Sequence, residues 1–191
     1  MIVKATETRM EYGEYLALEE RSAAKHEYLR GEVLAMAGGT PEHAALASAM
    51  TVALGTALRG RPCRLFSSDL RIRVAETDLT TYADVAVVCG RLEVAPDDRN
   101  AATNPVVIVE VLSDSTEAYD RGAKFAHYRR LPSLREYVLV AQDARRVEVY
   151  RRNESGRFEL FEFVGGQTLE LASISVSVGV DELYANPLGA T

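Results

Sequence analysis

The segment VVIVEVL, residues 106–112, most constrains the fold, because six of its seven residues are aliphatic. A run of this kind predicts a β-strand that is buried on both faces of a sheet. The exception is Glu110, and a glutamate is almost never fully buried unless it is paired or bound to a cation. The sequence therefore predicts a core strand with a carboxylate that needs a partner.

The order of the other elements predicts a mixed α/β (α+β) fold rather than a repeated βαβ pattern. The clearest helix is TPEHAALASAMTVALGTALRG, which Thr40 can cap and Gly60 can end. A second helix is expected over 115–130, with Ser113 or Ser115 as its cap. The remaining expected elements are a short helix (10–20), a hairpin (26–39, turning at Arg30–Gly31), three strand-like runs (63–74, 81–90, 105–113), a strand pair (135–152) and a hairpin around Gly165–Gly166 (156–171).

Length and composition indicate an ordinary globular protein. The 191 residues suit one domain, 1–191, with a sizeable core. No apolar run has the length of a membrane span or of a signal peptide, so we expect no membrane partner and, by default, a cytoplasmic location. Cys63 and Cys89 lie in expected strands, and we interpret them as buried free thiols.

Charge is unevenly distributed along the chain. The net charge of −6 argues against a generic nucleic-acid coat protein. Residues 121–157, however, contain ten Lys or Arg against four acids, and residues 59–73 contain five Arg against one acid. Arginine binds phosphate well through its planar fork, although a GC-rich genome would produce the same excess of arginine over lysine.

Two acids interrupt core-like strands in the same way. Glu110 lies in VVIVEVL and Asp84 lies in YADVAVV, each flanked by aliphatic residues. If the strands are neighbours, the two carboxylates meet, and each raises the pKa of the other unless a cation neutralises them. A hard divalent ion, Mg²⁺ or Mn²⁺, would do so with carboxylate oxygens, a backbone carbonyl and waters. The alternative for each acid is a surface position on an edge strand or a structural salt bridge.

Lys124 is one of three lysines and lies on the helix that follows the Glu110 strand. Asp120 precedes it by four residues, so the alternative is a helix pair worth about 0.3–0.5 kcal/mol. In the functional interpretation, the ammonium lies near the metal site and orients water or stabilises charge on a phosphate. Tyr128 follows one turn later on the same helix face.

Two further candidates come from the N-terminal half. Glu32 follows the turn of the first hairpin, and the alternative is an exposed hairpin acid. His43 lies in the first turn of the apolar helix, where a polar residue that starts the helix is the alternative to a ligand. Asp69 also interrupts a strand, but neighbouring arginines favour a salt bridge.

With these residues assembled, the chain resembles the Uma2 family of restriction-endonuclease-like proteins, formerly a domain of unknown function, over about Met10 to Tyr184. The strongest match is NPVVIVEVLSDSTEAYDRGAKFAHYRRLPSLREYVLV, residues 104–140. YLRGEVLAMAGGTPEH and TYADVAVV match the family in the same order. The family is similar to the PD-(D/E)xK nuclease superfamily, which implies a restriction-endonuclease-like αβββαβ core with a mixed central sheet flanked by helices and, here, extra C-terminal antiparallel strands.

The resemblance also implies roles for the candidates. Asp84 and Glu110 match the motif acids and would hold Mg²⁺, with the carbonyl of Val111 as an extra ligand. Leu112 stands where the superfamily has its usual lysine, and Lys124 would replace that lysine from the following helix. Glu32 and His43 match the N-terminal signature and would lie at the rim. Two departures leave these residues intact: Ala83 replaces a frequent proline before the aspartate, and Asp114 replaces a proline common in relatives.

The leading hypothesis is therefore a Mg²⁺- or Mn²⁺-dependent endonuclease that hydrolyses DNA phosphodiester bonds, with arginines binding the duplex. A homodimer is the expected assembly, because symmetric dimers are the commonest. Two alternatives stay open at this point. One is a catalytically inactive module that binds nucleic acid or protein, and the other is a metal-dependent hydrolase of another phosphate ester.

Overall fold

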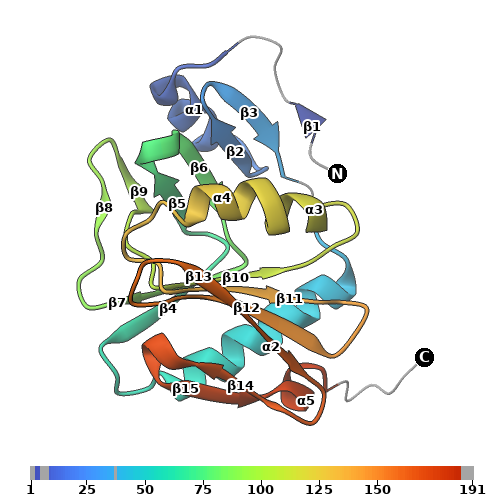
Figure 1. The fold of residues 1–191 in the computed structure, drawn as a ribbon. Coiled ribbons are helices and arrows are strands. Elements are labelled where there is room, and N and C mark those ends of the chain that lie inside the picture. Colours follow the sequence, from blue (N-terminus) through green and yellow to red (C-terminus); the bar gives the residue numbers. More distant parts are fainter. Residues whose placement is uncertain (1–2, 5–8, 37, 186–191) are drawn as a thin grey trace.

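The computed structural model describes residues 3–4, 9–36 and 38–185, and a six-stranded mixed sheet lies at its centre (Figure 1). The order across this sheet is β13 (Phe158–Val164), β12 (Arg146–Arg152), β11 (Glu136–Val140), β10 (Val107–Val111), β7 (Val85–Cys89) and β4 (Cys63–Ser67). β10 is parallel to β11 and antiparallel to β7. The mixed central sheet expected from the sequence is confirmed.

Helices cover both faces of this sheet, which is why β10 is buried on both sides. Val107 and Val109 pack with α2 (Pro41–Ala57) in one hydrophobic cluster. Ile108 and Leu112 point to the opposite face and pack with Tyr128 in a second cluster. Figure 1 shows α2 on one side of the sheet and the helix of residues 117–128 on the other. Glu110 shares the second face, because side chains alternate along a strand.

A seven-stranded sheet lies beyond that second helix in Figure 1 and carries the first hairpin. Its order is β1 (Val3–Lys4), β3 (Glu32–Ala35), β2 (His26–Leu29), β6 (Leu79–Tyr82), β5 (Arg71–Val74), β9 (Asp98–Ala102) and β8 (Val94–Ala95). The hairpin turns at Arg30 and Gly31, both with positive φ, as predicted. The short helix α1 (Tyr12–Glu19) packs Tyr15 against Tyr28 and Val33.

Two of the three expected strand runs are each divided between the sheets. Residues 63–74 form β4 and β5, and residues 81–90 form the end of β6 and then β7. The first break is a turn at Ser68–Asp69, where Lys25 bonds the Ser68 carbonyl and pairs with Asp69 at 2.7 Å. The second break falls at Ala83–Asp84. In the sequence each of these runs looks like one continuous strand, so the two crossings of the chain from one sheet to the other could not be seen there.

The expected hairpin around Gly165–Gly166 is wrong in its pairing. β13 pairs with β12, whereas β14 (Thr168–Leu171) pairs with β15 (Val176–Gly179) in a separate two-stranded sheet. A 3₁₀ turn, η3 (Ala172–Ile174), joins these two strands, and α5 (Val180–Leu183) follows them. Leu169 and Leu171 are buried in the α2 cluster, so packing on that helix draws β14 away from β13.

The second helix is interrupted by a π-helical turn. It consists of α3 (Glu117–Tyr119), the π segment η2 (Asp120–Lys124) and α4 (Phe125–Tyr128). The expected side-chain cap is not found, because Thr116 is the N-cap and makes no capping bond. The Ser113 carbonyl instead accepts the N–H groups of Thr116 and Glu117. No helix within residues 9–36 and 38–185 has the length and apolarity needed to cross a membrane.

The expectation of free thiols is corrected by a disulfide between Cys63 and Cys89. The two cysteines face each other in the register of β4 and β7, with a Cα–Cα distance of 3.9 Å. Neighbouring antiparallel positions bring side chains together, and pairing of strands 26 residues apart in the sequence could not be deduced from spacing alone.

Glu136 connects the central sheet to the turn of the small C-terminal sheet through hydrogen bonds. Its side chain is fully buried. One carboxylate oxygen accepts the Arg151 Nε–H at 2.7 Å and the Ala172 N–H at 3.1 Å. The other oxygen accepts the N–H and the hydroxyl of Ser173. Four bonds therefore compensate for the burial of this charge.

We expect Glu136→Ala to lower the free energy of unfolding by about 3 kcal/mol or more, because it leaves these donors without their acceptor. Urea denaturation followed by circular dichroism measures the change. Glu154→Ala, at an exposed position in the β12–β13 turn, is the control and should change stability by less than about 0.5 kcal/mol. Equal stabilities of the two variants would contradict this role for Glu136.

Candidate active site

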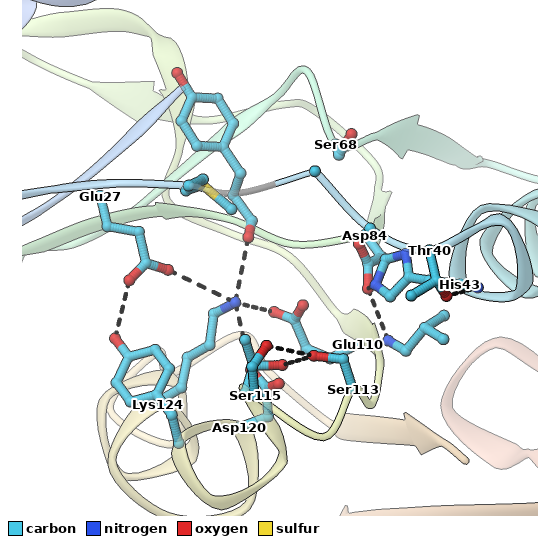
Figure 2. Close-up of a pocket in the computed structure, with 17 residues that line it drawn as sticks. Glu27, Thr40, His43, Ser68, Asp84, Glu110, Ser113, Ser115, Asp120 and Lys124 are labelled. Carbon is cyan, nitrogen blue, oxygen red and sulfur yellow. Dashed lines mark hydrogen bonds and ion pairs between the residues drawn. The ribbon is translucent and has the colours of Figure 1, made fainter. Parts of the chain in front are cut away.

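A cavity of about 170 Å³ lies where the two large sheets, α2 and the π-helical turn meet. Its polar lining is acidic, with four carboxylates, one lysine and one histidine: Glu27, Asp84, Glu110, Asp120, Lys124 and His43. Figure 2 shows their side chains gathered around one space, with Asp120 and Lys124 on the π turn and the others on different segments. Every site residue proposed from the sequence except Glu32 lines this cavity.

Asp84 reaches the cavity because the chain crosses between the sheets at this residue. β7 begins at Val85, which pairs with Val109 of β10, so Asp84 comes level with the end of β10. The Asp84 Oδ2 accepts the N–H of Val111 at 2.7 Å. The two acid-bearing strands are neighbours, which is the condition that the sequence left open for their carboxylates to meet, and this bond holds the Asp84 carboxylate beside Glu110.

His43 approaches Asp84 from the first turn of α2. Thr40 caps this helix by accepting the His43 N–H at 3.1 Å, as the sequence predicted. The His43 Nε2 lies 3.2 Å from the Asp84 Oδ2, and the hydrogen bond to Asp84 raises the pKa of the imidazole, with the Val111 backbone adding to the effect. A Cβ at Gly39 would lie 2.7 Å from the His43 Nδ1, so the glycine leaves room for the ring.

Lys124 and Glu110 form the centre of the cavity. The Lys124 Nζ lies 2.9 Å from the Glu110 Oε1, and both side chains are almost fully buried. The hydroxyl of Tyr128 donates to the same oxygen at 3.0 Å. Burial raises the pKa of Glu110 well above its ordinary value, and the nearby Lys124 charge opposes that rise. Lys124 is thus the main neighbour that favours the charged form of Glu110.

The ammonium of Lys124 is surrounded by oxygens. Its Nζ lies 3.6 Å from the Asp120 Oδ1 and 3.7 Å from the Glu27 Oε1, and it donates to the Tyr82 carbonyl (Figure 2). Burial acts to lower the pKa of Lys124, but the three surrounding carboxylates outweigh it and hold the pKa well above its ordinary value. Lys124 therefore stays protonated at neutral pH. It is positioned by the π turn, a feature often found at functional sites.

Glu27 is the charged cavity residue that the sequence did not single out. It lies on β2, is almost fully buried, and accepts hydrogen bonds from the hydroxyls of Thr81 and Tyr119. The sequence did contain a sign that Glu27 faces the interior. Side chains alternate along a strand, so Glu27 lies on the same face as Leu29, which packs against the core. The surrounding segment KHEY, residues 25–28, is polar enough to read as an ordinary hairpin strand, which concealed that signal.

Glu32, by contrast, lies outside the cavity, which corrects its expected place at the rim. It begins β3 beside the hairpin turn, opposite Leu29, and its side chain is exposed. Glu27 pairs with Leu34 two positions farther from the turn, on the same face of the hairpin. The hairpin thus does supply an acid to the cavity, but from its first strand.

The donor set suits a hard divalent cation. Within the described ranges, no group of three or more His, Cys, Asp or Glu side chains has a metal-holding arrangement. Mg²⁺, however, is usually bound by one or two carboxylates together with waters and substrate phosphate. Asp84 and Glu110 supply two carboxylates beside the backbone of Val111. The four acids also outnumber Lys124 and His43, and a divalent ion would favour the charged forms of these carboxylates.

Comparison with known proteins identifies the family of the chain. Residues 12–180 match the sequence model of the Uma2 family, described as "Putative restriction endonuclease". Two Synechocystis sp. proteins, named uncharacterized proteins slr1290 and sll1609, are 38% and 34% identical to the chain. The alignments cover 90% and 86% of this chain and 89% and 93% of those proteins.

A solved structure shares the fold. It is described as a putative nuclease belonging to DUF820 from Anabaena variabilis, with a TM-score of 0.73, 19% identity, and coverage of 92% of this chain and 97% of that one. At this identity, the likeness establishes a nuclease-like fold and no more. Because the family match spans nearly all of the described residues, we conclude that the chain belongs to the Uma2 family of restriction-endonuclease-like proteins.

Proposed function

We propose that this protein is a divalent-cation-dependent nuclease that hydrolyses DNA phosphodiester bonds, with its whole length acting as one domain. The observation that carries the proposal is the position of the Lys124 Nζ, 2.9 Å from the Glu110 Oε1 in an acid-lined cavity that Asp84 also lines. Membership of a family described as a restriction endonuclease supports the same chemistry. A homodimer and a cytoplasmic location stay predictions from the sequence.

Asp84, Glu110 and the carbonyl of Val111 are the groups that would hold Mg²⁺ or Mn²⁺. A bound ion of this kind polarises a phosphate and lowers the pKa of a coordinated water. The Val111 N–H keeps Asp84 in place, and the Tyr128 hydroxyl does the same for Glu110. Both carboxylates are thus oriented by the fold before any ligand arrives, which avoids a cost of reorganisation.

Lys124 acts as a cation rather than as a base. Its raised pKa keeps the proton on Nζ, where it can donate to a phosphate oxygen or orient the attacking water. Glu27 and Asp120 keep this ammonium charged and restrict its position. The arginines of residues 59–73 and 121–157 would bind phosphates along the DNA, which predicts salt-dependent affinity.

Glu110→Gln and Lys124→Met should each slow divalent-dependent nicking of supercoiled plasmid at least about 100-fold, the usual loss when a group that stabilises the transition state is removed. The assay uses Mg²⁺ and Mn²⁺ in parallel, with circular dichroism to confirm folding. Glu162→Gln, on the exposed part of β13, should nick at the wild-type rate. Wild-type protein inactive with both ions, or variants as fast as wild type, would contradict the proposal.

Mn²⁺ binding tests the ligands without relying on activity. Isothermal titration calorimetry should give a binding isotherm for the wild type and an affinity for Mn²⁺ at least about tenfold lower for Asp84→Asn. A loss of this size is common even when the mutated residue only hydrogen-bonds a metal ligand. Asp114→Asn removes the same charge from an exposed neighbouring turn and should bind as the wild type does. Equal affinities of the two variants would argue against Asp84 as a ligand.

Glu27 and Glu32 provide a matched pair on one face of the same hairpin. We expect Glu27→Gln to reduce the nicking rate by roughly tenfold, equivalent to about 1.4 kcal/mol of lost stabilisation, because Lys124 loses one of its carboxylates. Glu32→Gln should leave the rate unchanged. The result that would reverse this assignment is a slow Glu32→Gln enzyme together with a wild-type rate for Glu27→Gln.

A further inference from the structure

A second cavity, of about 560 Å³, lies at the other end of the helix that carries Lys124. It is formed by Phe125 of α4, the residues just after this helix, and the β12–β13 hairpin. Its lining comprises three arginines, three aromatic residues and a glycine: Arg129, Arg130, Arg157, Phe125, Tyr150, Phe158 and Gly156. We call this cavity the arginine–aromatic pocket.

The charge of the pocket is opposite to that of the chain as a whole. Among the described residues, no carboxylate lines it, although the protein carries a net charge of −6. Arg130 pairs with the exposed Glu76 at 3.2 Å. The guanidinium groups of Arg129 and Arg157 make no ion pair or hydrogen bond with any described residue. Exposed cations without acidic partners favour an anionic ligand.

A further arginine adds to the local positive charge. Arg152 lies with its guanidinium carbon 4.7 Å from the centre of the Phe158 ring. Its Nη2 donates to the main-chain carbonyls of Arg129 and Leu131, so no acid neutralises it there. The pocket therefore has both a cationic rim and a cation behind its aromatic lining.

The aromatic lining favours one class of anionic ligand over another. The Phe125 ring centre lies 4.6 Å from that of Tyr150 and 5.2 Å from that of Phe158. All three rings are half-buried and reach the pocket. Aromatic faces beside arginines are the usual means by which proteins bind unpaired nucleotides, through base stacking and phosphate contacts. An acidic peptide would use the arginines but would leave the rings without a matched partner.

The position of the pocket connects it with the cavity around Lys124. Phe125 follows Lys124 directly, and Arg129 comes five residues after the lysine, about 7–8 Å along a helix axis. This is roughly the length of two nucleotides of a DNA strand. A strand held at the first cavity would therefore reach the pocket within a few nucleotides.

We propose that the arginine–aromatic pocket binds an unpaired nucleotide of a DNA strand that flanks the active-site cavity. The choice of DNA rests on the proposed function. Arg129 and Arg157 contact backbone phosphates, and a base packs against the exposed edges of Phe158 and Tyr150. Single-stranded DNA consequently binds through this pocket more tightly than a duplex of equal length, whose bases are already stacked.

A tryptophan reporter tests the pocket directly, because the chain contains no tryptophan. In Phe158→Trp protein with EDTA present to prevent cleavage, a 12-nucleotide single strand should quench the fluorescence, and the matching duplex should quench it less.

The two arginines proposed to contact phosphates are tested in the same Phe158→Trp background. Arg129→Glu combined with Arg157→Glu should weaken binding of the single strand at least about tenfold. It should also reduce the slope of log affinity against log salt concentration by about 1.4, or 0.7 per phosphate contact. Arg91→Glu, an exposed arginine outside both basic segments, should change affinity less than about threefold.

The outcomes separate this inference from the proposed function. If the wild type nicks plasmid but the strand leaves the fluorescence of the Phe158→Trp protein unchanged, or the double variant binds as well as Arg91→Glu, the pocket proposal is overturned and the nuclease proposal stands. If the fluorescence is quenched by poly-glutamate and not by DNA, the occupant is an acidic peptide and the pocket proposal also fails. If quenching occurs as expected without any nicking activity, the pocket is confirmed and the nuclease proposal is the one that fails.

Discussion

The ammonium of Lys124 and the carboxylate of Glu110 lie 2.9 Å apart in the interior of the protein, and the arrangement of the cavity depends on this pair. Removing two charges from water is costly, and their attraction compensates only if other hydrogen bonds complete the shell. Tyr128 supplies one such bond to Glu110, and the Tyr82 carbonyl supplies another to Lys124. Glu110 belongs to the central sheet, the Tyr82 carbonyl to the seven-stranded sheet, and Lys124 and Tyr128 to the second helix. The pair and its partners therefore join three parts of the fold.

The crossing of the chain between the sheets gives the pair its neighbours. The strand run of residues 81–90 breaks at Asp84. At this break the Asp84 side chain turns toward β10 and accepts the Val111 N–H. β2 and its acid Glu27 belong to the same sheet as β6, the strand that leads into Asp84. The acids of the cavity are thus brought together by the junction of two sheets and not by one local motif.

The protein separates two kinds of electrostatic surface along one helix. The π turn presents Asp120 and Lys124 to an acidic cavity. The residues after α4 present arginines to an open pocket that no described carboxylate lines. An acidic site suits a metal ion, and a basic site suits phosphates that lie beyond it. The adjacency of the two explains how an acidic protein could bind an acidic polymer.

The sequence by itself determined the elements whose patterns are local. The cap at Thr40, the hairpin turn at Arg30–Gly31 and the doubly buried strand around Glu110 all follow from backbone preferences or from alternation within a few residues. It also singled out Asp84 and Glu110, because a charge within an apolar pattern is visible in one dimension. Lys124 and His43 were singled out by their places on the expected helices and by the family resemblance.

Only the tertiary structure decided which distant residues meet. The Cys63–Cys89 disulfide, the pairing of β14 with β15, the π turn and the exchange of Glu32 for Glu27 all depend on register and packing between segments far apart in the chain. A one-residue shift of register turns every side chain of a strand to the other face, and between strands that no tight turn joins, local preferences do not fix that register. The acidic cavity is therefore a product of strand pairing, and the sequence pattern alone could name most of its members but not their geometry.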